Sequence, residues 1–108
     1  RIALVIGNGA YQYTSRLSNT LNDADAMTTA LQNVGFEVIK VKNASLQVLE
    51  DNLNTFSARI ESGNYAVALC FYSGHGIQVN GENYLVPVDA NPLREADVKY
   101  QCLNAQRI

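Results

Sequence analysis

Two uninterrupted apolar runs constrain the fold of this chain more than any other feature. Residues 2–6 form one run, which ends at Gly7-Asn8-Gly9, and residues 65–72 form a longer one, which ends at Ser73-Gly74-His75-Gly76. Apolar runs without polar alternation are typical of parallel strands that are covered on both faces. We therefore predict a parallel sheet and expect residues 65–72 to be its central strand.

Two stretches with helical periodicity separate the apolar runs. Over residues 22–34, apolar side chains recur on one helical face at Ala26, Met27, Ala30, Leu31 and Val34. Over residues 46–60 they recur at Leu46, Leu49, Leu53, Phe56 and Ile60. A further strand is expected over residues 36–41, between the two helices. This alternation predicts an α/β fold with right-handed crossovers, a mostly parallel sheet and helices on both faces.

The ends of both helices carry suitable polar residues. Asn22 or Thr20 can cap the start of the first helix, and Gly35 follows its end. Asn43 or Ser45 can cap the start of the second helix. These residues support the predicted helix boundaries.

The segment after residue 76 predicts a hairpin and then a helix. Asn80-Gly81 stands between two short apolar segments, as in a tight β-hairpin, and Pro87 and Pro92 punctuate the following loop. From about Leu103 the pattern predicts a third helix, and the chain stops inside it. Because the sequence also starts without methionine, we expect it to be an excerpt or a processed part of a longer protein.

Length and composition restrict the chain to one domain and exclude several function classes. With 108 residues, 47% of them hydrophobic, and a formal net charge of −2, it supports one core and not two. A pI near 5.2 without a basic cluster argues against nucleic-acid binding, and no apolar run has the roughly 18 residues of a membrane span. These residues show no signal-peptide pattern, so we expect Cys70 and Cys102 to be reduced and the protein to be cytoplasmic.

Nucleotide and phosphate chemistry fit the loops poorly. Gly7-Asn8-Gly9 invites a dinucleotide-binding interpretation, but the third glycine of that fingerprint is replaced by Gln12, and no P-loop motif occurs. A receiver domain begins with the same order of elements, yet its phosphoacceptor aspartate would stand where the segment 72–75 stands. A nucleotide-binding regulator is therefore the weakest of the alternatives.

His75 is the only histidine, and its position favours catalysis. A lone histidine is often a solvated bystander, but this one follows the longest apolar run and lies between Gly74 and Gly76. A general base needs open access to its substrate, and a backbone N–H in a glycine-flanked turn can point at a developing oxyanion. A metal site would need further histidine or cysteine ligands, and the two cysteines are poorly placed for that.

Five segments resemble those of a known family. They are residues 2–8, 21–24, 35–38, 71–76 and 84–90, of which the last two read Phe-Tyr-Ser-Gly-His-Gly and Tyr-Leu-Val-Pro-Val-Asp-Ala. The chain resembles the large-subunit half of the caspase-like cysteine peptidases, most closely the metacaspases and the bacterial caspase homologues. The resemblance implies that residues 1–108 are the N-terminal part of a caspase-like domain, truncated before the strand that bears the nucleophile.

The resemblance also implies a Cys–His dyad that cleaves peptide or protein substrates. His75 would protonate the leaving amine, and Gly76 would donate its N–H to the oxyanion. The nucleophilic cysteine belongs about 50 residues after the histidine, near position ~125. We therefore expect the C-terminal part of the same protein as a companion chain, released by autoprocessing, and expect residues 1–108 alone to be inactive.

Neither cysteine of the chain is a suitable nucleophile. Cys70 lies inside the apolar run, five residues before His75, and is interpreted as a core residue. Cys102 precedes the expected third helix and is interpreted as structural, because a nucleophile must come within hydrogen-bonding distance of its base.

Substrate specificity is expected to reside in an acidic pocket. By the resemblance, Asp23 and Ser73 line the pocket for an Arg or Lys side chain before the scissile bond. Asp23 is at the same time a favourable charge at a helix N-terminus, a role that we also assign to Asp25. An Asp-selective pocket would need basic residues, and only Arg16 lies in the first loop.

Calcium and a non-catalytic role remain as alternatives. Asp89 and Asp97 are candidates for the calcium site of some metacaspases, but Val98 stands where those carry a second acid, and a loop-capping role fits Asp89 better. We therefore expect no metal or other cofactor. The rival function is a catalytically inactive caspase-like module that binds other proteins.

Overall fold

The first sheet has three parallel strands with β1 in the middle. The computed structural model describes residues 1–91 and 95–108. It places β1 (Ile2–Gly7) between β2 (Glu37–Lys42) and β3 (Ala68–Ser73). All six residues of β1 are buried, as expected for a strand covered on both faces. The predicted parallel α/β architecture is confirmed.

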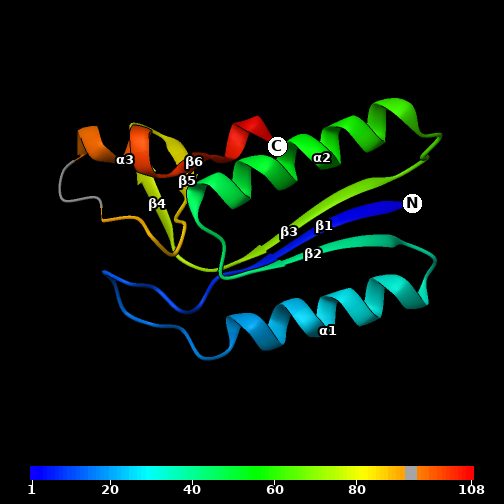
Figure 1. The fold of residues 1–108 in the computed structure, drawn as a ribbon, viewed down its shortest axis with the longest axis horizontal. Helices are drawn as coiled ribbons and strands as arrows, with labels where there is room; N and C mark the ends of the chain where they lie inside the picture. The colour runs from blue at the N-terminus through cyan, green and yellow to red at the C-terminus, as the bar shows by residue number, and fades with distance from the viewer. Residues whose placement is uncertain (92–94) are drawn as a thin grey trace.

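The two long helices cover opposite faces of this sheet. α1 (Thr20–Asn33) and α2 (Leu46–Ser62) lie on either side of the strands (Figure 1). Side chains alternate along β1, since successive residues of a strand point to opposite faces. Ile2, Leu4 and Ile6 pack in the cluster that includes α2, whereas Ala3 and Val5 pack in the cluster that includes α1.

The helix ends agree only in part with the sequence. Ser45 caps α2 by accepting a hydrogen bond at Oγ from the Val48 N–H, as predicted. α1 begins earlier than predicted, after Asn19, and no side chain hydrogen bond caps it. The predicted caps of α1 were therefore wrong. Gly35 follows α1 with a φ of +89°, a conformation that favours glycine.

The position of β3 differs from the prediction. β3 pairs with β1 on one side only, so it is an edge strand of the described sheet rather than the central one. Its regular part starts at Ala68, and Val67 and Leu69 are 43% and 37% exposed. An apolar run indicates that its residues are buried by neighbouring elements, but it cannot show whether those elements lie within the same 108 residues. Among the residues that the structure describes, no strand pairs with the outer edge of β3.

A second, smaller sheet contains the predicted hairpin. β4 (Gly76–Val79) pairs with β5 (Glu82–Leu85), and β6 (Leu103–Asn104) pairs with the other side of β5. Asn80 and Gly81 have φ angles of 51° and 79°, the positive pair that a type I′ turn requires. The hairpin therefore turns where the sequence predicted.

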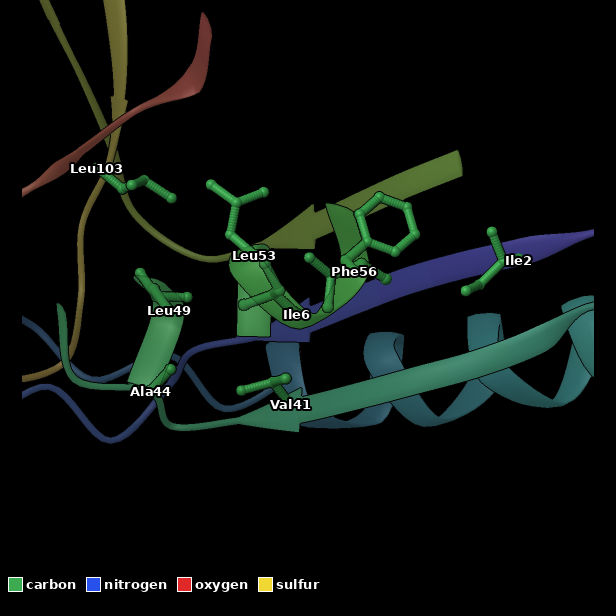
Figure 2. Packing of buried hydrophobic residues seen from close by; sticks show 9 residues of the cluster. Ile2, Ile6, Val41, Ala44, Leu49, Leu53, Phe56 and Leu103 are labelled. Carbon is green, nitrogen blue, oxygen red and sulfur yellow. The ribbon is translucent and has the colours of Figure 1, made fainter. Parts of the chain in front are cut away.

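The C-terminal segment departs most from the prediction. α3 (Glu95–Gln101) was not expected, and the 3₁₀ turn η1 (Ala105–Arg107) takes the place of the helix predicted from about Leu103. Leu103 is 1% exposed, because β6 directs it into the cluster of Leu49 and Leu53 against α2 (Figure 2). Pro92 lies outside the described residues. Among the described residues, no helix is long and apolar enough to cross a membrane.

Candidate active site

The loops that follow β1 and β3 meet at the carboxyl edge of the first sheet. The two strands run in parallel to their ends at Gly7 and Ser73, and the Asn8 N–H donates to the Ser73 carbonyl at 2.9 Å. α1 begins on the same side, where Ser73 Oγ donates to Asp23 Oδ2 at 3.1 Å. The topology thus brings together Asp23 and Ser73, for which the family resemblance implies one pocket.

Hydrogen bonds fix the backbone of His75 on both sides. Its N–H donates to Tyr11 Oη at 2.8 Å. Its carbonyl accepts from Tyr72 Oη at 2.6 Å and from the Val86 N–H at 3.1 Å. The histidine is therefore held in place although it lies in the short connection between β3 and β4.

The imidazole ring has its own partners. His75 Nε2 lies 2.7 Å from the Ser15 carbonyl oxygen, and the ring centroid is 4.5 Å from that of Tyr11 at an interplanar angle of 54°. A carbonyl oxygen only accepts, so Nε2 carries the proton and Nδ1 of the neutral ring keeps a lone pair. One nitrogen is thus held by the loop, and the other can accept or donate a proton in a reaction.

Three polar residues around His75 were missed by sequence reasoning. Tyr11 and Asn8 are 2% and 0% exposed, and both donate to the Val86 carbonyl, at 3.1 and 3.3 Å. Asn8 Oδ1 also accepts from the Ala44 N–H at 2.9 Å. The third is Tyr72, the last residue of the apolar run. Each lies near or shortly after the carboxyl end of a strand of the parallel sheet, and this position is a sequence signal for polar side chains that support a site.

The N–H groups of Gly9 and Ala10, in the glycine-containing part of the first loop, are already used. Asn43, with a φ of 52°, accepts at Oδ1 from the N–H groups of Gly9 and Ala10 at 3.1 and 3.0 Å. A phosphate-binding loop needs such groups free to point at the ligand. The structure therefore gives the nucleotide-binding alternative no support.

The two glycines beside His75 have different surroundings. A Cβ atom on Gly74 would lie 2.5 Å from Tyr72 Oη and 2.7 Å from Tyr11 Oη. A Cβ on Gly76 would meet only the Tyr84 carbonyl oxygen, at 3.6 Å. Gly74 is thus required for the packing of the two hydroxyls, whereas Gly76 is open.

A family comparison fits this geometry. The family model of the caspase domain matches residues 1–108, the whole chain. The chain belongs to the caspase family. The expected family resemblance and the caspase-like α/β fold are therefore confirmed, and the domain has the fold of the caspase-family peptidases.

The similar proteins include a paracaspase and a caspase. "Mucosa-associated lymphoid tissue lymphoma translocation protein 1" of Homo sapiens is 31% identical over 109 residues, which cover 100% of this chain and 12% of the relative. "Paracaspase" of Dictyostelium discoideum is 29% identical over 87% of this chain and 24% of its own length. "Caspase-12" of Mus musculus is 30% identical over 71% of this chain and 18% of its own length. The chain thus spans a small part of each relative.

Both thiols of this caspase domain are unpaired and poorly suited to attack a carbonyl. Burial raises the pKa of Cys70 to about 11, and burial likewise raises the pKa of Cys102 to about 11. A thiol with such a pKa is almost entirely protonated near neutral pH, whereas the thiolate is the nucleophile. Cys70 lies opposite Leu4 within the sheet, three residues before its end at Ser73.

The residues considered for calcium do not fit a site for this ion. Asp89 Oδ1 accepts a hydrogen bond from the Leu46 N–H at 3.2 Å, so its carboxylate supports the start of α2 as a loop cap. Calcium needs six or more oxygen ligands. In residues 1–91 and 95–108, no group of three or more His, Cys, Asp or Glu side chains could hold a metal ion.

The other charged residues near the site have separate roles. Asp25 forms ion pairs with Lys40 and Lys42 of β2, at 3.0 and 2.7 Å, and these partners lower the pKa of its carboxyl, Lys42 most. Because α1 begins at Thr20, Asp25 lies beyond the first turn of the helix, and its predicted role as a helix-end charge was wrong. Arg16 is exposed and lines an open hollow of about 370 Å³ between the first loop and the start of α1.

Proposed function

We propose that this domain belongs to a cysteine endopeptidase in which His75 is the acid and base. The observation that carries the proposal is the contact of 2.7 Å between His75 Nε2 and the Ser15 carbonyl. It selects one tautomer and one ring orientation, and it leaves Nδ1 for proton transfer. The peptidase fold of the caspase family supports the same conclusion.

The nucleophile is proposed to be a cysteine outside residues 1–108. Its thiol passes a proton to His75, and the thiolate attacks the carbonyl carbon of the substrate while the carbonyl π electrons move to oxygen. When the C–N bond breaks, His75 gives its proton to the leaving amine and an acyl-thioester remains. Water then attacks the thioester, His75 takes a proton from the water, and the thiolate leaves from the carboxylic acid product.

Gly76 is proposed to donate its N–H to the oxyanion of these intermediates. The Val86 N–H bonds to the His75 carbonyl, and the hairpin register places these two residues directly opposite each other. Hydrogen-bonded and non-hydrogen-bonded pairs alternate along an antiparallel ladder, so the next pair, Gly76 and Leu85, is of the second kind. The Gly76 N–H therefore points away from β5 and can bind a ligand.

The outer edge of β3 is the proposed place of the missing strand. This edge has no partner strand among the described residues, and apolar side chains such as Val67 and Leu69 lie exposed along it. A nucleophile about 50 residues after His75 would end a strand added there. Residues 1–108 are then the N-terminal, large-subunit part of the domain. The C-terminal part of the same protein, separated by autoprocessing, is the proposed companion chain.

Asp23 and Ser73 are proposed to bind an Arg or Lys side chain of the substrate. Both lie at the same edge as His75, and the Ser73 hydroxyl already orients the Asp23 carboxylate at 3.1 Å. A carboxylate binds a guanidinium through two parallel hydrogen bonds but binds an ammonium only as a point charge. Arg should therefore be preferred over Lys, and an acidic substrate side chain should be repelled.

Peptides with Arg, Lys or Asp before the scissile bond test this proposal in the full-length protein. Asp23→Asn should lower kcat/KM for the Arg peptide at least about tenfold, because a hydrogen bond to a charged group contributes about 1.5–3 kcal/mol. Asp25→Asn is the matched control on the same helix, since Asp25 pairs with β2, and it should leave kcat/KM unchanged.

Two results would contradict the proposal. Cleavage after Asp, or an unchanged Arg preference in a folded Asp23→Asn variant, contradicts the assignment of the pocket. A residue other than cysteine at the expected position, about 50 residues after His75, contradicts the dyad and favours an inactive binding module.

A further inference from the structure

His75 lies between two glycines, Gly74 and Gly76. Glycine has the widest choice of backbone conformations, so local preference does not fix the orientation of this histidine. Contacts from other segments must do so. Those contacts come from Tyr11, in the first loop, and from Tyr72, near the end of β3.

We infer that Tyr11 and Tyr72 are positioning residues for His75. The Tyr11 hydroxyl holds the N–H of the histidine and the Tyr72 hydroxyl holds its carbonyl, while the Tyr11 ring lies against the imidazole. This inference rests on the proposed role of His75 in catalysis. Neither tyrosine is expected to touch the substrate.

The hydroxyl groups can satisfy all these contacts at once. Tyr11 Oη accepts from the His75 N–H at 2.8 Å and donates its own proton to the Val86 carbonyl at 3.1 Å. Tyr72 Oη donates to the His75 carbonyl at 2.6 Å. Each hydroxyl then donates its proton in one hydrogen bond, and both the N–H and the carbonyl of His75 have a partner. Burial raises the pKa of Tyr72, so its hydroxyl stays protonated as a donor.

The Tyr11 ring restricts the imidazole on a second side. The Ser15 carbonyl holds Nε2 at 2.7 Å, and the Tyr11 ring contacts the imidazole at 4.5 Å between centroids. Together they limit rotation of the imidazole ring and thereby fix the direction in which Nδ1 points. Proton transfer depends strongly on such orientation, whereas substrate binding in the Asp23 pocket does not. Loss of the contact should therefore act on kcat more than on KM.

The structure makes room for both hydroxyls at one point. A Cβ on Gly74 would lie 2.5 and 2.7 Å from Tyr72 Oη and Tyr11 Oη, so only glycine leaves this space. The two hydroxyls lie 3.2 Å apart beside it. Gly74 is thus required for the position of the two tyrosine hydroxyls beside His75.

Tyr11→Phe in the full-length protein tests the inference, with Tyr84→Phe as the matched control. Both tyrosines are buried in the same apolar cluster, at 2% and 4% exposed, but the Tyr84 hydroxyl donates to Glu82, away from His75. We expect Tyr11→Phe to lower kcat about tenfold on an Arg peptide with KM within about twofold, and Tyr84→Phe to change neither. Equal losses of kcat in the two variants would overturn the inference, because the effect would then be one of stability.

The NMR signals of His75 test the inference independently of the proposed activity. In full-length protein with ¹³C,¹⁵N-labelled histidine, the His75 amide and ring signals are assigned by their loss in His75→Gln. Tyr11→Phe should shift both signals and Tyr84→Phe should shift neither; unshifted signals in Tyr11→Phe would overturn the inference. If the wild type cleaves no peptide, the proposed function fails and these signals alone decide. If Tyr11→Phe does not fold, Tyr72→Phe takes its place, with the same shifts expected and the same result contradicting the inference.

Discussion

The two ends of the parallel sheet use their polar side chains in different ways. At the amino end, Arg59 and Tyr65 both bond to the Glu37 carboxylate, and Arg1 donates to the Val34 carbonyl at 2.8 Å. Glu37 and Arg1 are exposed to solvent. These contacts join elements at the surface, and water competes for each of them.

At the carboxyl end, two polar side chains, Asn8 and Tyr11, are buried and bond mainly to loop backbone. Asn8 joins Ala44 and Val86, and Tyr11 joins His75 and Val86. Both side chains are almost fully buried, at 0% and 2% exposed. They connect the first loop to three other segments that are distant in the chain, at Ala44, His75 and Val86.

The difference shows which end needs a fixed loop geometry. Loops have few apolar contacts, so hydrogen bonds from buried side chains are the available means of holding them. An unpaired buried group is costly, and a fully paired network therefore specifies one arrangement. Only the carboxyl end carries such a network around a histidine, which is why we place the chemistry there.

Asn8→Ala, at the carboxyl end of the sheet, should lower the free energy of unfolding more than Glu37→Gln, at the amino end. It removes the acceptor of the buried Ala44 N–H and one donor to the Val86 carbonyl. We expect a loss of about 1–3 kcal/mol in the free energy of unfolding, measured by urea denaturation of the full-length protein. A loss no greater than that of Glu37→Gln would break the contrast between the two ends.

Glu37→Gln should have a smaller effect that depends on pH. The hydrogen bond from Tyr65 and the charge of Arg59 lower the pKa of Glu37 below its usual 4.5. The stabilisation is therefore fully present above about pH 4.5 and is lost as the pH falls through the lower folded-state pKa. Melting temperatures of wild type and Glu37→Gln should differ at pH 7 and converge in acid. The Asn8→Ala difference should not converge, because an amide does not titrate; a pH-independent Glu37→Gln difference would refute the ion-pair account.

Much of the fold could be predicted from the sequence because its signals are local. The two apolar runs, the helical periodicity and Asn80-Gly81 specify strands, helices and a turn over a few residues each. The face predicted for α1 was wrong in part: Ala26, Ala30 and Val34 are exposed, and the buried residues are Thr20, Ala24, Thr28 and Leu31. The role of Leu103 could not be predicted in this way. Its strand pairing with Leu85 and its packing against α2 depend on residues far along the chain. The edge position of β3 could not be read from apolarity either.

The residues of the candidate site likewise fall into those that could be predicted from the sequence and those that could not. His75 could be singled out because a strand end and two glycines are visible in the sequence, whereas Ser73 and Asp23 were assigned to a pocket only by the family resemblance. Tyr11, Tyr72 and Asn8 were missed because tyrosine and asparagine occur widely in loops, and only the folded chain shows what they bond to. The Ser15 carbonyl carries no sequence signal, because every residue has one.

His75→Asn in the full-length protein tests the central claim most directly. With an Arg peptide as substrate, kcat/KM should fall by at least about 100-fold, since a general acid and base contributes about 10²–10⁴-fold. The melting temperature should stay close to that of the wild type, because the backbone contacts of residue 75 to Tyr11, Tyr72 and Val86 do not involve the ring. A folded His75→Asn variant that cleaves the peptide at the wild-type rate would contradict the account.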